Sequence, residues 1–223
     1  MEKKKKAAAE AAIELVKDGM VVGLGTGSTA NFAIEGLGKR VGEGLRIRGV
    51  ATSKATEELA RRVGVPVVTL EEVGRLDLTI DGADEVDPQF NLIKGMGGAL
   101  LREKIVAFAS RQEVIIVDDS KLVDVLGTKS PLPVEVVPFG HLRTKDALES
   151  LGCKASLKGG SSPFLTDNGN LIYECKFAKI EEPEILEAEI DLIPGVVESG
   201  LFIDLATKVV VASGRGIEVR SKR

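Results

Sequence analysis

The sequence predicts an α/β fold: a Rossmann-like parallel sheet that carries an inserted, smaller α+β unit of the ferredoxin-like type. Two observations predict it. In the first half, short and nearly all-apolar runs alternate with helix-like segments, a pattern typical of a parallel sheet covered on both faces. From about residue 130 the order becomes strand, helix, strand, strand, helix, strand, which is the split ferredoxin-like unit.

The first half is built from four apolar runs. A helix through Ala8 to Leu15 is expected to stop by Gly19, and lysines at its start oppose the helix dipole, so that end is expected to fray. The expected strands follow at residues 20–24, 47–51, 76–80 and 113–117, with a lesser strand at 65–70. The segments between these strands have helical spacing and cover the sheet.

The second half has its own element order. The expected strands span residues 132–137, 153–158, 170–177 and 201–205, and the expected helices span 141–152 and 181–192. The tail, residues 208–220, reads as a strand pair that returns to the first sheet. The predicted domains are therefore residues 1–129 plus 206–223, and residues 130–205.

Composition restricts the function classes. The chain is 43% hydrophobic and 29% charged, and 30 basic against 34 acidic side chains give a net charge of −4. This charge does not favour a nucleic-acid partner. No apolar run approaches the roughly 18 residues of a membrane span, and Cys153 and Cys175 are expected as buried free thiols. A cytoplasmic protein is expected.

His141 is the sole histidine and follows no nucleophile signature, so neither a His-rich metal site nor a Ser-His-Asp triad is predicted.

A polar cluster follows each expected parallel strand. The clusters are GLGTGST (23–29), TSKAT (52–56), DGADEVD (81–87) and DDSK (118–121). Ligands of open α/β sheets bind outside the carboxyl ends of the strands, so these clusters are expected to converge on one crevice.

Two of these clusters allow more than one interpretation. GLGTGST lacks the dinucleotide and P-loop spacings, so it is either an anion cradle or a tight turn with Ser28 or Thr29 as the helix N-cap. DGADEVD is either an acidic surface loop or a divalent-cation site, although its spacing is not that of an EF-hand. Lys94 and Lys121 would add positive charge beside these acids, or act as ordinary salt-bridge partners.

Glu103 has unusual neighbours for a helix glutamate. Three and four positions away lie Ala99, Leu100, Val106 and Ala107, none of them basic or polar. Glu103 is therefore either an ordinary residue of a solvated helix face or a partly dry carboxylate. In the second case burial would raise its pKa toward neutrality, where a general base works best.

Four motifs taken together resemble one family. GTGST, DGAD, KGMGG followed by ALLREK, and DDSK occur in this order in ribose-5-phosphate isomerases of the A type, and the similarity extends over nearly the whole length. Met96 departs from the pattern, because the family more often has glycine there. The resemblance implies interconversion of ribose 5-phosphate and ribulose 5-phosphate through a cis-enediolate, without metal or organic cofactor.

The resemblance also implies roles for individual residues. Glu103 would transfer the proton, Lys94 would stabilise the enediolate oxygen, and Asp81 and Asp84 would bind hydroxyls and assist ring opening. The residues implied in substrate binding are Thr26, Gly27, Ser28, Thr29, Gly82, Ala83, Gly95, Met96, Gly97 and Lys121. Thr26 to Thr29 and Lys121 would hold the phosphate. A homodimer or tetramer is expected from the same resemblance.

Two alternatives from other classes remain at this level. A sugar-phosphate sensor would resemble this fold, but no segment is left over for a DNA-binding helix-turn-helix. A coenzyme A transferase relative would instead use its glutamate to form a covalent intermediate. A nicotinamide dehydrogenase lacks support because the fingerprint glycines are missing.

Overall fold

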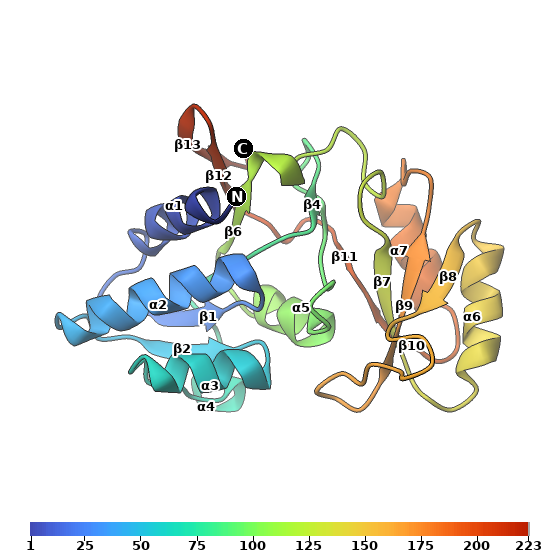
Figure 1. Cartoon of the computed structure of the whole chain (residues 1–223). Helices are drawn as coiled ribbons and strands as arrows, with labels where there is room; N and C mark the ends of the chain where they lie inside the picture. Colours follow the sequence, from blue (N-terminus) through green and yellow to red (C-terminus); the bar gives the residue numbers. More distant parts are fainter. Residues whose placement is uncertain (223) are drawn as a thin grey trace. The chain divides into compact units, whose positions relative to one another are not determined.

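The computed structural model describes residues 1–222 (Figure 1). The chain divides into two compact units, each considered by itself below. Unit 1 consists of Met1–Ala83, Arg102–Lys121 and Asp204–Arg223, and unit 2 consists of Asp84–Leu101 and Leu122–Ile203. The predicted domain boundaries at 129/130 and 205/206 stay a prediction.

Unit 1 contains a six-stranded sheet in the order β13-β12-β6-β3-β1-β2. Its strands are β1 (Val21–Leu24), β2 (Arg48–Ala51), β3 (Leu78–Asp81), β6 (Glu113–Asp118), β12 (Lys208–Ser213) and β13 (Gly216–Ser221). All neighbouring pairs are parallel except β12 with β13. The predicted parallel sheet and the return of the tail to it are both confirmed.

Helices cover both faces of this sheet (Figure 1). They are α1 (Glu2–Ile13), α2 (Ser28–Gly42), α3 (Lys54–Arg62), α4 (Leu70–Val73) and α5 (Leu100–Phe108). Side chains of α1, α2 and α3 share one buried cluster with alternate strand residues such as Val22 and Leu24. On the other face, Val106 of α5 and apolar residues of α4 pack against Val21 and Val50. Burial on both faces explains why the strands are almost entirely apolar.

Unit 2 contains the ferredoxin-like arrangement that the element order predicts. Its four-stranded sheet has the order β10-β7-β9-β8, in which every neighbouring pair is antiparallel. The elements are β7 (Leu132–Val136), α6 (His141–Ser150), β8 (Lys154–Leu157), β9 (Leu171–Lys176), α7 (Pro183–Asp191) and β10 (Val196–Ser199). Leu148 of α6 and Ile190 of α7 pack on Val134 and Tyr173 to form its core.

The last strand of this sheet differs from the prediction. Residues 201–205 were expected there, but the position is filled by β10, and residues 201–202 form β11 in a different sheet. That sheet contains β4 (Glu85–Val86), β5 (Leu92–Ile93) and β11 (Leu201–Phe202), in the order β11-β5-β4. The chain changes sheets at Gly200, where an added Cβ would lie 2.3 Å from the carbonyl oxygen of Lys94. Only glycine allows backbones to approach this closely.

The lesser strand predicted at residues 65–70 is also wrong. A single bridge joins Val67 to Gly49, and the helix α4 begins directly afterwards. Pro66 has no amide hydrogen to donate to a ladder. Thr69 and Glu72 then form a capping box that starts the helix instead of continuing a strand.

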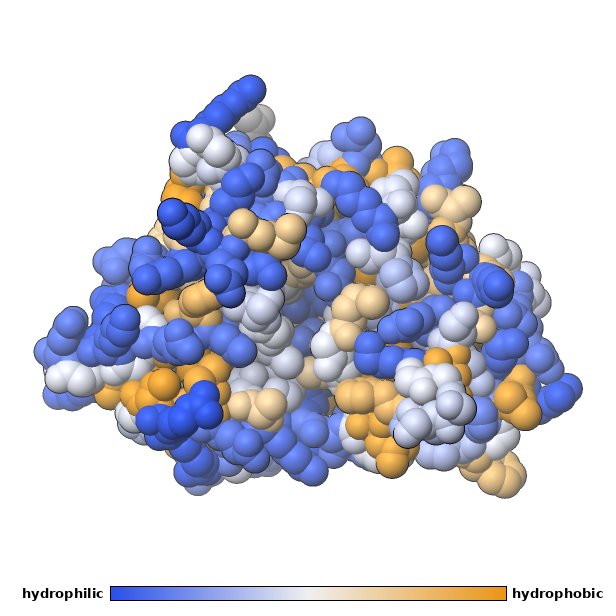
Figure 2. All heavy atoms as spheres, viewed as in Figure 1, coloured by the Kyte–Doolittle hydropathy of each residue, from blue (hydrophilic) through white to orange (hydrophobic). Residues whose placement is uncertain are grey.

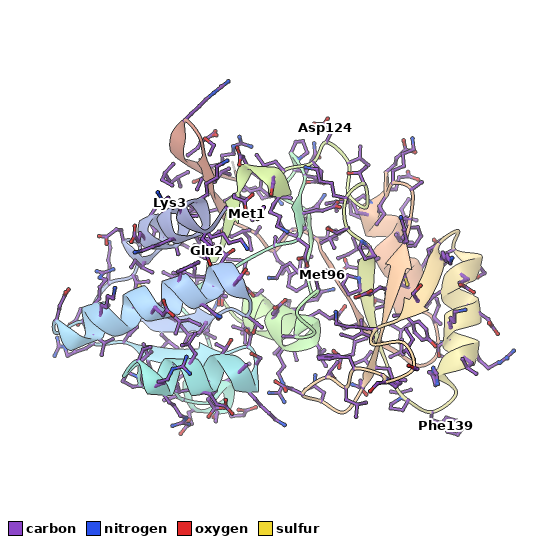
Figure 3. All side chains as sticks on the ribbon, in the orientation of Figure 1. Met1, Glu2, Lys3, Met96, Asp124 and Phe139 are labelled. Carbon is purple, nitrogen blue, oxygen red and sulfur yellow. The ribbon has the colours of Figure 1, made fainter. Side chains whose placement is uncertain are left out.

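The surface is mixed. Hydrophilic residues cover most of the face shown in Figure 2, with apolar residues between them in small groups. Phe108 and Phe139 are among the most exposed apolar side chains, and Figure 3 labels Phe139 beside the turn that precedes α6. Within residues 1–222, no helix combines the length and the apolar character needed to cross a membrane.

Candidate active site

In unit 1 the polar clusters lie at one edge of the sheet. Because β6, β3, β1 and β2 are consecutive and parallel, the segments that follow them emerge at the same edge. Thr26 occupies a central position there. Its backbone N–H donates to Asp81 Oδ1 at 3.1 Å, and its Oγ1 lies 2.7 Å from Thr52 Oγ1 and 2.9 Å from Ser53 Oγ. The convergence expected for the segments after β1, β2 and β3 is therefore found.

Asp81 ends β3 and is buried, with 1% of its surface exposed. Its Oδ1 accepts hydrogen bonds from the N–H of Thr26 and, at 2.7 Å, from that of Gly82. Gly25 is required beside it, because a Cβ there would lie 2.1 Å from Asp81 Oδ1. The glycine after β1 thus makes room for the aspartate after β3.

Gly27 is the N-cap of α2, with φ at 117°, and no side chain caps this helix. The alternative in which Ser28 or Thr29 is the N-cap is therefore wrong. Both residues lie in the first turn, where backbone N–H groups have no partner within the helix. This helix start, with the hydroxyls of Ser28 and Thr29, has the chemistry that binds anions.

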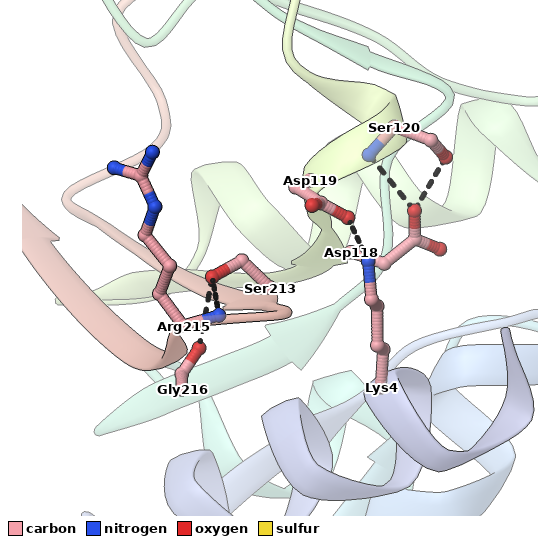
Figure 4. Close-up of polar contacts among 7 residues, drawn as sticks. All are labelled: Lys4, Asp118, Asp119, Ser120, Ser213, Arg215 and Gly216. Atoms are coloured by element: carbon pink, nitrogen blue, oxygen red, sulfur yellow. Dashed lines mark hydrogen bonds and ion pairs between the residues drawn. The ribbon is translucent and has the colours of Figure 1, made fainter.

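Two lysines of α1 that contact the polar clusters could not be identified from the sequence. Lys5 Nζ donates to Ser28 Oγ at 2.8 Å, and Lys4 Nζ contacts Asp119 Oδ1 at 2.7 Å (Figure 4). The helix α1 begins at Glu2, in place of the frayed end that its lysine run predicts. No local pattern distinguishes these two lysines from their neighbours, since α1 and β6 are distant in sequence.

The segment after β6 carries both signs of charge. Burial is the largest influence on the pKa of Asp118 and raises it, whereas hydrogen bonds from the N–H and hydroxyl of Ser120 lower it (Figure 4). Together with the charges of Lys121 and Lys5, they hold the pKa of Asp118 below its ordinary value. Lys121 ends the short 3-10 helix Asp119–Lys121 and is half-buried.

Glu103 is buried on α5, with 4% of its surface exposed. The neighbours Ala99, Leu100, Val106 and Ala107 are each at most 9% exposed. The interpretation of Glu103 as part of a solvated helix face is therefore wrong. The four apolar neighbours that the sequence indicates are buried with it.

Ala83 lies in unit 1, whereas Asp84 and the candidates on the loop that joins β5 to α5 lie in unit 2. Lys94 follows β5 and is 2% exposed, and its Nζ lies 5.3 Å from the centroid of the Phe202 ring. Asp84 Oδ2 accepts from the N–H of Met96 at 3.1 Å. Figure 3 shows Met96 in this loop. Met96 is half-buried and Gly97 is exposed.

The other acids of DGADEVD bind backbone. Buried Glu85 accepts from the N–H groups of Gly127 and Lys129, each at 2.7 Å, and from that of Ser130. Burial raises the pKa of Asp87 above its ordinary value, despite the opposing hydrogen bonds from Asn91 and Gln89. Among residues 1–222, no group of three or more His, Cys, Asp or Glu side chains is arranged to hold a metal ion.

Comparison with known proteins gives one family. The family model described as ribose 5-phosphate isomerase A (phosphoriboisomerase A) matches residues 48–216. A ribose-5-phosphate isomerase A from Gloeobacter violaceus is 57% identical over 96% of this chain and 94% of its own.

Solved structures agree with this result. The structure of ribose 5-phosphate isomerase A from Methanocaldococcus jannaschii has a TM-score of 0.94 and 42% identity, over 99% of both chains. A D-ribose-5-phosphate isomerase in complex with phospho-erythronic acid has a TM-score of 0.94 and 40% identity, over 99% of this chain and 98% of its own. This chain therefore belongs to the ribose 5-phosphate isomerase A family.

Proposed function

We propose that this chain is the isomerase that interconverts D-ribose 5-phosphate and D-ribulose 5-phosphate. The observation that carries the proposal is the match to ribose-5-phosphate isomerase A at 57% identity over 96% of the chain. An isomerase of this kind moves a proton between C2 and C1 of the open sugar through a cis-enediolate. It needs a base, a group that stabilises the developing oxyanion, and a holder for the phosphate.

Glu103 is assigned as the base. A carboxylate that shuttles a proton between neighbouring carbons works best where water cannot compete for that proton, and Glu103 is 4% exposed. Its helix α5 packs against the sheet through Val106, which gives the carboxylate a fixed support.

Lys94 is assigned to the enediolate oxygen. Its ammonium is buried against the Phe202 ring, and charge in a site that excludes water stabilises an oxyanion more strongly than it would in water. Asp81 and Asp84 are assigned to the sugar hydroxyls and to opening of the furanose ring, and Gly82 and Ala83 to binding the sugar. The hydrogen bonds that Asp81 and Asp84 accept from backbone N–H groups support their fixed orientation.

The phosphate is assigned to the start of α2. Gly27, Ser28 and Thr29 offer backbone N–H groups and hydroxyls, and Lys5 lies 2.8 Å from Ser28 Oγ. Lys121 is assigned to the same phosphate. The local positive charge replaces the general attraction that a chain of net charge −4 does not supply.

We further propose that the enzyme works without metal or organic cofactor, in the cytoplasm, as a homo-oligomer, either a dimer or a tetramer. Its place would be the non-oxidative branch of the pentose phosphate pathway. Residues 1–129 plus 206–223 would form the catalytic domain and residues 130–205 the ferredoxin-like domain. Family membership supports the assembly, which light scattering after size-exclusion chromatography would measure.

The test of the function is an assay of the purified protein with ribose 5-phosphate, following ketose formation. We expect turnover in both directions. Binding of ribose 5-phosphate without turnover would favour a sensor domain, and a covalent mass increase with an acyl-coenzyme A would favour a transferase. The family match favours neither alternative.

A further inference from the structure

The turn at Gly95–Gly98 has two possible backbone arrangements. It is closed by a hydrogen bond from the Gly98 N–H to the Gly95 carbonyl at 2.9 Å. The two common forms of such a turn, types I and II, differ by a flip of the central peptide, here the one between Met96 and Gly97. Glycine at position 97 permits both forms. Contacts from outside the turn can therefore stabilise one orientation of this peptide over the other.

Lys158 supplies such a contact. Its Nζ donates to the Met96 carbonyl oxygen at 2.9 Å, while the Met96 N–H donates to Asp84 Oδ2 at 3.1 Å. In a trans peptide the carbonyl and the following N–H point in opposite directions. Because the Met96 carbonyl points at Lys158, the Gly97 N–H points away from it.

Lys158 is itself held in place. Its ammonium also donates to Glu174 Oε1 at 3.1 Å and lies 5.7 Å from the centroid of the Phe164 ring. An ammonium has three donors, so both oxygens can be served at once. The Lys158 side chain is 20% exposed, which shields these contacts from much of the water.

Phe164 packs against the turn at Gly98. A Cβ on Gly98 would lie 2.5 Å from carbon atoms of the Phe164 ring, so the ring rests directly on the glycine. The Phe164 N–H donates to the Lys158 carbonyl at 2.9 Å, which ties the two side chains to one loop. Two side chains of the β8–β9 connection thus clamp a turn that is about sixty positions away in sequence.

We propose that Lys158 is a positioning residue of the isomerase: it selects the peptide orientation that aims the Gly97 N–H at the sugar chain of the substrate. The inference rests on the proposed function. The amide would donate to an oxygen of the sugar near the reacting carbons, not to the phosphate. Lys158 does not touch the substrate, and its effect reaches the reaction through Met96 and Gly97.

The test compares Lys158→Met with Lys158→Arg and with Lys176→Met. Methionine keeps the length and the apolar stem but cannot donate, arginine keeps the donors, and Lys176 is an exposed lysine on β9. Lys158→Ala, which also removes the donor, replaces Lys158→Met if the methionine variant does not fold. For each protein, kcat and KM for ribose 5-phosphate are measured, with inhibition constants for phospho-erythronic acid and for inorganic phosphate.

In Lys158→Met the Gly97 N–H is still present but no longer points at the substrate. We therefore expect kcat/KM of this variant to fall by about tenfold. Inhibition by phospho-erythronic acid should weaken similarly, while inhibition by inorganic phosphate stays unchanged. Lys158→Arg should recover most of the loss, and Lys176→Met should match the parent.

Two results would overturn the inference. One is a Lys158→Met enzyme within about twofold of the parent in kcat/KM. The other is an equal loss of affinity for inorganic phosphate, which would mean a general structural defect. An inactive parent protein would instead refute the proposed function, so the two failures are distinguishable.

Discussion

Glu103 is a buried carboxylate on the helix α5. Its carboxylate is 4% exposed and its helical neighbours at positions 99, 100, 106 and 107 are buried alanine, leucine and valine. A glutamate that served stability alone would more often face water, since removing an ionisable group from water costs free energy. This cost is understandable if the residue transfers a proton.

Replacing Glu103 with glutamine tests this role. Glutamine keeps the size and the hydrogen-bonding capacity, so helix α5 should survive, but it cannot take a proton from C2 at neutral pH. We expect kcat to fall by about 10²–10⁴-fold, the usual contribution of a general base. The KM for ribose 5-phosphate should change little. Glu35→Gln, on the exposed face of α2, is the matched control and should keep full activity. A Glu103→Gln enzyme within several-fold of the parent would move the base to Asp81 or Asp84.

Asp118 gives a pH-dependent prediction. Its pKa is lower in the folded protein than in the unfolded chain, because the hydrogen bonds from Ser120 and the charges of Lys121 and Lys5 together outweigh the effect of burial. The ionised Asp118 therefore stabilises the fold above its unfolded pKa of about 3.9, and this stabilisation is lost as pH falls through the folded pKa. Ser120→Ala removes the hydroxyl donor. It should lower the free energy of unfolding by about 1 kcal/mol at pH 7, and the difference from the parent should shrink below pH about 4.

Urea unfolding between pH 2.5 and pH 7 measures this difference. Ser150→Ala is the control, because the Ser150 hydroxyl donates to the backbone carbonyl of Ala147 at 2.6 Å and no titrating group is involved. Its effect should be the same at every pH. A Ser120→Ala difference that is equally constant would contradict the assignment.

Among the secondary-structure elements, the sequence predicts best the strands that are apolar throughout. The four apolar runs at 20–24, 47–51, 76–80 and 113–117 become β1, β2, β3 and β6, because strands buried on both faces must be apolar throughout. The strand β10 was missed for the opposite reason. Its segment VVES is only partly buried, whereas the more apolar Leu201 and Phe202 are fully buried in a different sheet. The hydropathy of a segment indicates whether it is buried, but it does not indicate which strand the segment pairs with.

Glu135 of β7 anchors the β8–β9 connection. Its Oε1 accepts from Thr166 Oγ1 at 2.9 Å, Asn168 Nδ2 at 3.2 Å and Asn170 Nδ2 at 2.9 Å, while the residue is fully buried. The sequence offers no local signal for this group, because the acceptor and the donors lie more than thirty positions apart. The three donors fix the loop that carries Phe164 and begins at Lys158.

Replacing Glu135 with leucine should leave these donors without their acceptor. We expect the free energy of unfolding to fall by about 2–4 kcal/mol, since buried polar groups that lose their partner are costly. Glu135→Gln keeps an acceptor oxygen and should lose less. Glu189→Leu, at an exposed position of α7, should change stability by less than about 0.5 kcal/mol. Urea denaturation measures all three variants. A Glu135→Leu protein as stable as the parent would show that the loop is held by other contacts.

For the molecule as a whole, the sequence predicts the candidate residues that lie at or just after the ends of strands. It does not predict those whose side chains contact the candidate residues from distant parts of the chain. Asp81 and the Gly25–Thr29 turn follow β3 and β1, so the topology of a parallel sheet brings them together. Lys5 and Lys158 approach their partners from 23 and 62 positions away, and a lysine in a charged stretch gives no sign of its partner. Long-range side-chain contacts of this kind depend on the completed fold.

The acids of DGADEVD lead to the last prediction, that activity survives removal of metal ions. Glu85 accepts from the N–H groups of residues 127, 129 and 130, Asp87 accepts from Asn91, and Asp84 Oδ2 accepts from the N–H of Met96. Oxygen atoms directed at amide hydrogens are poorly placed to converge on a hard cation, which needs six or more oxygen ligands. After dialysis against EDTA, with metal content checked by mass spectrometry, kcat should stay within about twofold of the untreated enzyme. A dialysis without EDTA is the control for handling losses. Loss of activity that Mg²⁺ or Mn²⁺ restores would contradict this prediction and make Asp81 and Asp84 metal ligands, with the oxyanion then stabilised by the ion in place of Lys94.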